Sequence, residues 1–450
     1  MPGNEYGGNR AMRRTTKFAI GLAVGTLVGT GPADATGYQL REQSAVGQGA
    51  SFAGAAARGD DPSFLFFNPA AMAWLPGTQG ALVGSGIFPG VEAQSGSATR
   101  NAAFRGSPII GSLGGDIGVD AFVPANYATI ALAEDFRFGV SVNSPWGLVT
   151  KSPNDFIGRY HALTSSLRTI NLSPAVSWRP LPNLAFGAAL QVQHAATRLS
   201  SAVDYGAAGA RAGLIPGSRD GRSTVSGNDT SFGWHIGTQW EPLPGTRLGA
   251  AFRSAVFHEI KGDVNFEGVP APLRPAFANS SARAKLVTPE TATFGLSQQV
   301  SAGWTLLAGA EWTNWSRFRD LVVNFDSGRA PSITEQRWRD SWFFSAGAEY
   351  HWNERLTFRG GVAYDQTPVQ TAERTPRIPD NDRYWLSVGA SYQVMPNVIL
   401  TGGYSHIFAS DARVSLQDPG PANTNLLRGN LDATYRASVD IVTAQLRFAF

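Results

Sequence analysis

The sequence contains no cysteine in its 450 residues and only 6 histidines. Disulfides, thiolate nucleophiles and cysteine-based zinc or iron–sulfur sites are therefore excluded. Charged residues are scarce, at 16%, whereas soluble proteins typically contain about 25%. The formal net charge is only +3 and no run of Lys and Arg occurs, so the composition gives no reason to expect a nucleic-acid partner.

No stretch of about 20 apolar residues, the length that a membrane-spanning helix needs, occurs in the chain. A shorter apolar run, Phe18–Val28, follows several basic residues and precedes Ala33-Asp34-Ala35. This three-part pattern is typical of a secretory signal peptide, and an N-terminal anchor is the alternative. We expect residues 1–35 to be the signal peptide, with Met1 or Met12 as the start.

The sequence also lacks the common catalytic motifs. No G-x-S-x-G nucleophile elbow occurs. His258-Glu259 begins like the zinc motif H-E-x-x-H, but position 262 is Gly, so the second histidine is missing. The histidines form no cluster along the sequence. We therefore expect no enzymatic activity, no metal and no cofactor.

Period-two alternation is the strongest structural signal. In the last stretch, every second residue from Val442 to Phe450 is apolar, while Gln445 and Arg447 lie between them. Such alternation gives a strand one apolar and one polar face. In a soluble sandwich the apolar face would be the core, whereas in a membrane barrel it faces lipid. The same pattern recurs in Leu248–Val256, Trp342–Tyr350, Leu356–Tyr364 and Tyr384–Val394.

The spacing of the expected strands favours the barrel. We count about 14 strands from Thr78 onward, and short and long connections alternate, as in barrels with short periplasmic turns and longer extracellular loops. A sandwich with Greek-key crossings would not alternate in this way. The expected long connections are Gly90–Gly118, Lys151–Thr164, Ala202–Asp229, Asp263–Arg283, Asp326–Glu335, Pro368–Asp382 and Leu416–Asp432.

Residues 36–77 do not alternate and are rich in small residues, so short helices are expected there. One interpretation is a periplasmic tail. The other is a plug that folds into the lumen, which the small residues favour because they let backbones pack closely. We predict a hatch over 36–77 and a transmembrane barrel over 78–450.

Several short motifs occur in order along the chain: Gly37-Tyr38-Gln39-Leu40, Asn68-Pro69-Ala70, Phe252-Arg253-Ser254, Trp312-Thr313-Asn314-Trp315-Ser316 and Ile378–Ser387. Together they resemble the FadL-type long-chain fatty-acid transporters (OmpP1/FadL/TodX) over essentially the whole mature chain. The resemblance implies a 14-stranded antiparallel barrel with an N-terminal hatch in the cell outer membrane. It also implies passive uptake, with capture by extracellular loops and lateral release at a kink in the third strand.

The third expected strand, Phe136–Val142, meets Asn143-Ser144-Pro145-Trp146-Gly147. Proline lacks the N–H that a ladder needs and glycine weakens a strand interior, so central strands avoid this pair. We predict that Asn143, Ser144, Pro145, Trp146 and Gly147 form the kink. The alternative is that the strand ends there and a loop begins.

Two long loops carry apolar side chains, which is unusual on a surface unless they bind something. Local loop packing is the alternative interpretation of these residues. The predicted capture groove consists of Leu214, Ile215, Phe266, Val269, Leu273 and Phe277.

A fatty acid would need a cationic partner for its carboxylate. The candidates are Arg198, Arg337 and Arg339, although an arginine in a barrel lumen is more often part of a salt-bridge network. Aromatic hydrocarbons, which other family members carry, need no such charge.

We therefore predict passive uptake of long-chain fatty acids or similar hydrophobic molecules. The alternatives are an aromatic-hydrocarbon channel, a general porin without a hatch, and a non-transporting barrel that acts as an adhesin or receptor. The expected partners are the hydrophobic ligand, outer-membrane lipid, and the barrel-assembly machinery through Phe450. We expect a monomer.

Overall fold

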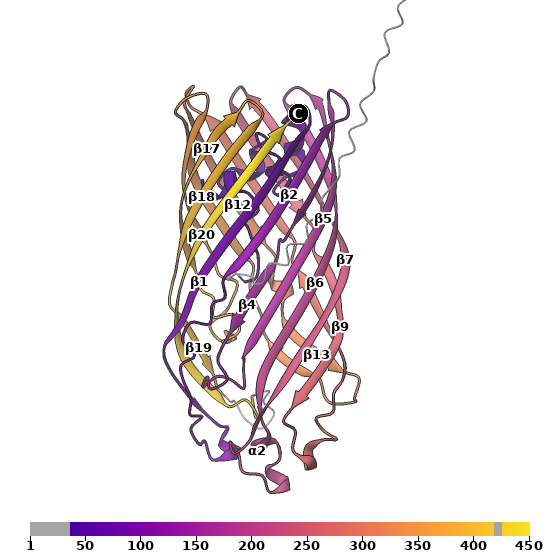
Figure 1. Cartoon of the computed structure of the whole chain (residues 1–450), viewed down its shortest axis with the longest axis vertical. Helices are drawn as coiled ribbons and strands as arrows, with labels where there is room; N and C mark the ends of the chain where they lie inside the picture. The colour runs from indigo at the N-terminus through magenta and orange to yellow at the C-terminus, as the bar shows by residue number, and fades with distance from the viewer. Residues whose placement is uncertain (1–36, 418–424) are drawn as a thin grey trace, which may run out of the picture.

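The computed structural model describes residues 37–417 and 425–450, so the predicted signal peptide lies outside the described residues. Twenty strands form one sheet within the described part, and β1 pairs with β20, which closes the sheet into an antiparallel barrel (Figure 1). The barrel has 14 wall strands, because several of them are interrupted and consist of two segments.

The continuous wall strands are β1 (Gln79–Thr99), β2 (Ala121–Ala131), β5 (Thr164–Leu181), β6 (Leu184–Asp204), β7 (Asp220–Leu243), β16 (Leu356–Asp365), β17 (Arg383–Met395) and β20 (Asn430–Ala449). The interrupted ones are β3 with β4 (Phe136–Asn143, Gly147–Lys151), β8 with β9 (Thr246–Arg253, Val256–Glu267), β10 with β11 (Ser280–Thr288, Thr291–Gln299), β12 with β13 (Trp304–Thr313, Asp320–Phe325), β14 with β15 (Ser332–Glu335, Ser341–His351) and β18 with β19 (Val398–Ala409, Ala412–Leu416).

Helices are few and short among the described residues, and none of them has the length and apolar character needed to cross a membrane. The α-helices are α1 (Ala45–Gln48) and α2 (Tyr205–Ala208). The 3-10 helices are η1 (Ala55–Ala57), η2 (Pro62–Phe66), η3 (Pro69–Trp74), η4 (Ala102–Phe104), η5 (Ala210–Ala212), η6 (Ala271–Leu273) and η7 (Trp315–Arg317).

The alternation seen in the sequence separates the outside of the barrel from the inside. On β17, Leu386 and Val388 are half exposed on the outer surface, while Trp385 and Ser387 between them are buried. The predicted barrel is confirmed, and tight turns and the C-terminus lie together at one end (Figure 1). The long connections lie at the opposite end.

Some wall strands extend further than predicted. β7 begins at Asp220, inside the stretch Ala202–Asp229 that was expected to be a connection, and its pairing with β6 continues to Asp204↔Asp220. β1 likewise continues beyond Gly90 to Thr99. Past the apolar band both faces of a strand meet polar surroundings, so the alternation disappears although main-chain pairing continues.

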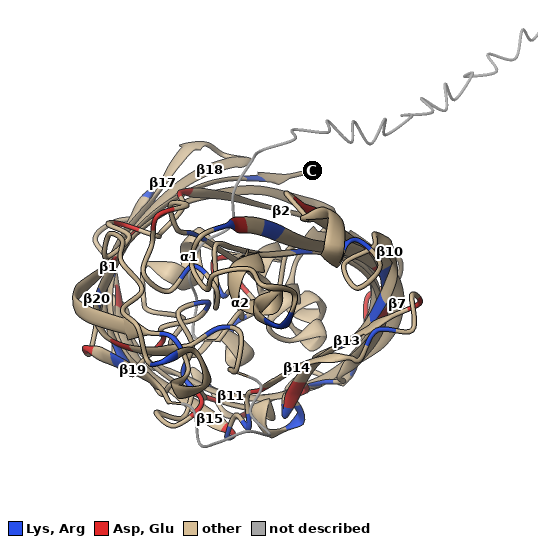
Figure 2. Ribbon diagram, turned by 90° about the horizontal axis from the view of Figure 1, so that it is seen from below, with Lys and Arg blue, Asp and Glu red and all other residues tan. Residues whose placement is uncertain are grey.

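The N-terminal segment, residues 37–78, lies in the barrel and touches several sides of the wall. Its helix η3 contacts β5, β6 and β7, whereas α1 contacts β17, β18 and β20. Figure 2 shows α1 inside the ring of strands. Asn68 caps η3, since its Oδ1 accepts from the Ala70 N–H at 2.9 Å, and its Nδ2 donates to Ala56 O at 2.7 Å and to Thr238 O of β7 at 3.0 Å.

Buried charges add further contacts between this segment and the wall. Arg58 lies 2.6 Å from Asp60 and 2.8 Å from Glu349 of β15. Arg41 lies 2.9 Å from Glu311 of β12. Removing one partner of such a buried pair is costly, because the other charge is left uncompensated.

Glycines in the wall allow the segment to approach the strands closely. A Cβ added at Gly237 of β7 would lie 2.0 Å from Asn68 Oδ1, and one added at Gly361 of β16 would lie 2.3 Å from the main chain of Ala50. A Cβ at Gly402 of β18 would meet no atom within 4 Å. A side chain at Gly237 or Gly361 would therefore collide with the N-terminal segment, whereas one at Gly402 would not.

We predict that Gly237→Leu weakens the docking of the N-terminal segment, since overpacking a buried contact costs about 1–3 kcal/mol. The expected result is faster proteolytic cleavage of residues 37–78 and a lower thermal unfolding midpoint. Gly402→Leu is the matched control and should leave both unchanged. Equal behaviour of the two variants would contradict the close contact at Gly237.

Candidate functional site

The third wall strand is interrupted between Asn143 and Gly147, where β3 ends and β4 begins. In the pairing with β5, Asn143 lies opposite Asn171 and Gly147 lies opposite Arg168. The third wall strand therefore advances four residues over the length in which β5 advances three. The extra residue makes the strand bulge, and a bulge locally disrupts pairing.

On its other side, the third wall strand stops pairing with β2 at the same break. β3 pairs with β2 only up to Val142↔Asn126. The stretch Ala121–Ala125 of β2 has partners on β1 but none on the third wall strand. The ladder of main-chain hydrogen bonds is therefore open between β2 and the break.

The N-terminal segment supplies some of the missing partners from inside. Leu40 N–H donates to Pro145 O at 2.9 Å, and Gly147 N–H donates to Tyr38 O at 2.8 Å. Gln43 adds two side-chain bonds to the main chain of Ser144, at 2.9 and 3.3 Å. Since a buried N–H or C=O without a partner is costly, these bonds hold the break in place.

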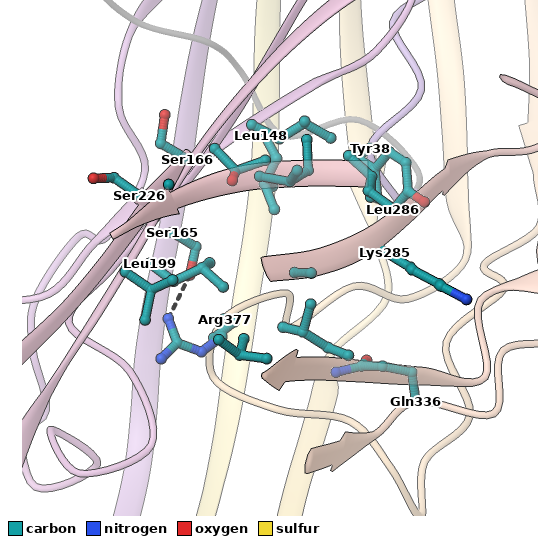
Figure 3. Close-up of a pocket in the computed structure, with 18 of the residues that line it drawn as sticks. Tyr38, Leu148, Ser165, Ser166, Leu199, Ser226, Lys285, Leu286, Gln336 and Arg377 are labelled. Carbon is teal, nitrogen blue, oxygen red and sulfur yellow. Dashed lines mark hydrogen bonds between the residues drawn. The ribbon is translucent and has the colours of Figure 1, made fainter. Parts of the chain in front are cut away.

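A cavity lies next to this region, in the half of the barrel nearer the long connections, and together with the open solvent at its mouth it measures about 890 Å³. Side chains from β4, β5, β6, β9, β10 and β13 line it, and most are apolar (Figure 3). Its apolar lining includes Leu148, Leu167, Leu199, Ile260, Leu286 and Ile378.

Three cationic residues line this cavity, Arg283, Lys285 and Arg377. Lys285 extends away from it (Figure 3), and Arg283 is exposed and lies 3.7 Å from Asp326. Of the three, only Arg377 is not exposed.

The Arg377 guanidinium donates to Ser165 Oγ at 3.0 Å, to Thr164 O at 3.1 Å and to Ser200 O at 3.2 Å. No carboxylate of residues 37–417 and 425–450 forms an ion pair with it.

Arg377 stays charged at neutral pH. Its removal from water, reinforced by the nearby Arg428, lowers the pKa of Arg377 to about 9. His161 lies in the same region, and burial lowers its pKa to about 3, so it is neutral. The positive charge at this end of the cavity therefore comes from arginine alone.

An aromatic cluster connects the lining of the cavity with the break in the wall, since Tyr38 lines the cavity and Trp146 belongs to the break. Tyr38 packs edge-on against Trp315 with ring centroids 4.6 Å apart, and against Trp146 at 5.9 Å. Its hydroxyl donates to Val287 O at 2.9 Å. Trp338 completes the cluster at 5.7 Å from Tyr38.

A second, smaller cavity of about 320 Å³ lies on the other side of this cluster. Its lining includes Pro145 and Trp146 of the break and Gln39 of the N-terminal segment. It also contains Arg253 and Glu311, so it is more polar than the first cavity.

The structure brings together only part of the predicted capture groove. Phe266 and Phe277 pack edge-on at 5.4 Å, and Arg329 lies over both rings, at 4.9 and 4.4 Å. Ile215 is 70% exposed, and Leu214, Val269 and Leu273 are half-buried. None of these six residues lines the two cavities.

The three predicted carboxylate partners also lie away from the cavities. Arg198 is exposed on β6, Arg339 is exposed, and Arg337 pairs with Glu335 at 2.8 Å. Arg377, the cavity arginine, lies in the long connection 366–382 and was not a candidate. Alternation of apolar and polar residues cannot predict the role of a loop residue. The one sequence signal near Arg377 is that it directly precedes Ile378, the first residue of a family motif.

Comparison with known proteins identifies relatives over nearly the full length. The family described as outer membrane protein transport protein (OMPP1/FadL/TodX) matches residues 26–450. A putative outer membrane protein of Neisseria meningitidis is 27% identical over 462 residues, which cover 95% of this chain and 98% of that one. A long-chain fatty acid transport protein of Escherichia coli is 27% identical over 429 residues, 89% of this chain and 93% of that one.

Solved structures show the same fold. A Pseudomonas aeruginosa FadL homologue superposes with a TM-score of 0.84 at 25% identity, covering 92% of this chain and 99% of that one. The Ralstonia pickettii toluene transporter TbuX gives a TM-score of 0.64 at 20% identity, with 91% and 99% covered.

We predict that Ile260→Trp fills the larger cavity and lowers its affinity for a hydrophobic fluorescent probe at least about tenfold, or about 1.4 kcal/mol. The measurement is a fluorescence titration of the purified barrel. Phe257→Trp is the control, because Phe257 lies on the same strand but is 61% exposed. Undiminished probe binding by Ile260→Trp would show that the probe binds elsewhere.

Proposed function

The chain belongs to the FadL/TodX family of outer-membrane transport proteins for hydrophobic substrates, and on that premise we propose that its own substrate is a long-chain fatty acid. The ligand enters from the long-loop end, occupies the larger cavity and leaves sideways through the break in the third wall strand. The observation that carries the proposal is the Arg377 guanidinium at one end of a cavity whose lining is mainly apolar.

The chemistry of Arg377 suits a carboxylate. A guanidinium has five N–H donors, and Arg377 donates to three neutral oxygens. A ligand carboxylate would add charge-assisted hydrogen bonds, which are about twice as strong as neutral ones. An alkyl chain would fit the remaining lining, which includes Leu167, Ile260 and Leu286.

The competing candidate is an aromatic hydrocarbon, the substrate class named for the toluene transporters that share the fold. The apolar lining would contribute to the binding free energy of such a ligand, but the guanidinium would not. A charged group that no ligand uses would only lower the affinity of the cavity for an uncharged molecule. This argument favours an anionic amphiphile.

Within this proposal, residues 37–78 serve as the hatch. Buried contacts with strands on several sides of the wall support that role, because they leave little open lumen. The bonds from Tyr38, Leu40 and Gln43 to the break support an exit that opens when this end of the segment moves.

We predict that Arg377→Leu lowers the affinity for a long-chain fatty acid about tenfold or more, since a hydrogen bond to a charged group contributes about 1.5–3 kcal/mol. Affinity for the alcohol of the same chain length should not change. Isothermal titration with both ligands checks this, and Arg337→Leu, which removes an exposed and already paired arginine, is the control. A loss that is equal for acid and alcohol would argue against a carboxylate partner.

We predict that Pro145→Val slows uptake of labelled fatty acid by cells while leaving ligand affinity unchanged, because valine restores the N–H that a regular ladder needs. Pro89→Val is the matched control, since Pro89 lies within β1 and pairs with Val439 of β20. If a folded Pro145→Val barrel takes up the fatty acid at an unchanged rate, the ligand does not leave through the break.

A further inference from the structure

Three cationic side chains gather on the outer surface of the barrel beside the break. They are Lys151 of β4, Arg168 of β5 and Arg198 of β6, and all three are exposed. We call them the outer cation cluster. They follow the same side of the sheet, because their inward neighbours, such as Leu148, Leu167 and Leu199, line the larger cavity.

The strand register places the two arginines close together and Lys151 further along the same face. Arg168 lies opposite Ala196, and Arg198 lies opposite Ser166, so the two arginines are diagonal neighbours on one face. Diagonal neighbours in a sheet are about 7–8 Å apart, within reach of long side chains. Lys151 lies opposite Thr164, further along the same face of β5.

No carboxylate neutralises this cluster. None of the three side chains takes part in an ion pair with the described residues, and their partners in the register are uncharged: Thr164, Gly147, Ala196, Ser166 and Ser226. Cations further round the barrel differ in this respect. Lys261 lies 3.7 Å from Glu259, and Arg283 lies 3.7 Å from Asp326.

Exposed apolar residues begin directly beside the cluster, on the side toward the tight turns. Ile170 and Leu172 follow Arg168 on β5, and they are 57% and 44% exposed. Leu190 on β6 and Phe232 on β7 continue this apolar surface, at 49% and 66%. In an outer-membrane barrel such a surface contacts lipid chains, so the cluster lies at the boundary of the outer leaflet, on the long-loop side.

We propose that the outer cation cluster binds the phosphate groups of the phosphorylated glycolipid of the outer leaflet. The glycolipid is favoured over free phosphate because the cations lie on an open surface rather than in a pocket, and because acyl chains have an adjoining apolar surface. Anionic lipid headgroups attract basic residues that lie next to the apolar band.

The position of the cluster gives the bound lipid a place beside the exit. Arg168 pairs directly with Gly147, the first residue after the break. A glycolipid held by the cluster would therefore form the lipid surface on one side of the opening between β2 and the third wall strand.

The test compares the full-length barrel with a triple variant, Lys151→Gln, Arg168→Gln and Arg198→Gln. Native mass spectrometry in detergent measures binding of bisphosphorylated lipid A, of its dephosphorylated form and of inorganic phosphate. We expect the wild type to prefer bisphosphorylated lipid A over the dephosphorylated lipid about tenfold or more, and the triple variant to lose that preference. Heat-modifiable migration on gels verifies that each variant is folded.

The matched control replaces three exposed arginines or lysines that are ion-paired, with Lys261→Gln, Arg283→Gln and Arg413→Gln, and it should retain the preference. The proposal is overturned if the triple variant binds lipid A as the wild type does, or if the control loses the preference equally. It is also overturned if both lipid forms bind equally well, or if inorganic phosphate displaces the lipid. None of these outcomes depends on which substrate the barrel transports.

Discussion

The need of every main-chain N–H and C=O for a partner governs this structure. In the apolar interior of a membrane water cannot supply partners, so the sheet must close on itself. β1 and β20 close it along a ladder from Gln79 to Thr99, with one register shift between Ala93 and Ser95. Beside Ala121–Ala125 the ladder has no partner on the third wall strand, and at the nearby break a segment from inside the barrel supplies partners for Pro145 and Gly147.

This arrangement joins the interior and the wall into one unit. The Tyr38 side chain lines the larger cavity and its carbonyl accepts from Gly147, so the same residue contacts a ligand space and the break. Arg41, three residues on, holds the segment to Glu311 on another part of the wall. A change in one of these contacts therefore alters the surroundings of the others.

The barrel could be predicted from the sequence because lipid on one face and a polar lumen on the other impose a period of two, as from Val442 to Phe450. The interruption near Pro145 was also visible, since proline cannot donate to a ladder. The cavity could not be predicted in this way. It is built by side chains from many strands and from loop 366–382, and Arg377 faces it because of tertiary packing, which no local pattern records. The role proposed for Arg377 rests on its position in the cavity, and the role proposed for the capture groove rests on the resemblance to the family.

The depth at which the N-terminal segment is buried has a consequence for the order of assembly. Ala45 N–H donates to Gln445 Oε1 across 400 residues of sequence, and the Gln48 side chain reaches Ile441 O. The first elements of the chain thus complete their contacts only after the last strand has been made. Because β20 also pairs with β1 along the closing edge of the sheet, the docking of this segment and the closure of the barrel share the same strand.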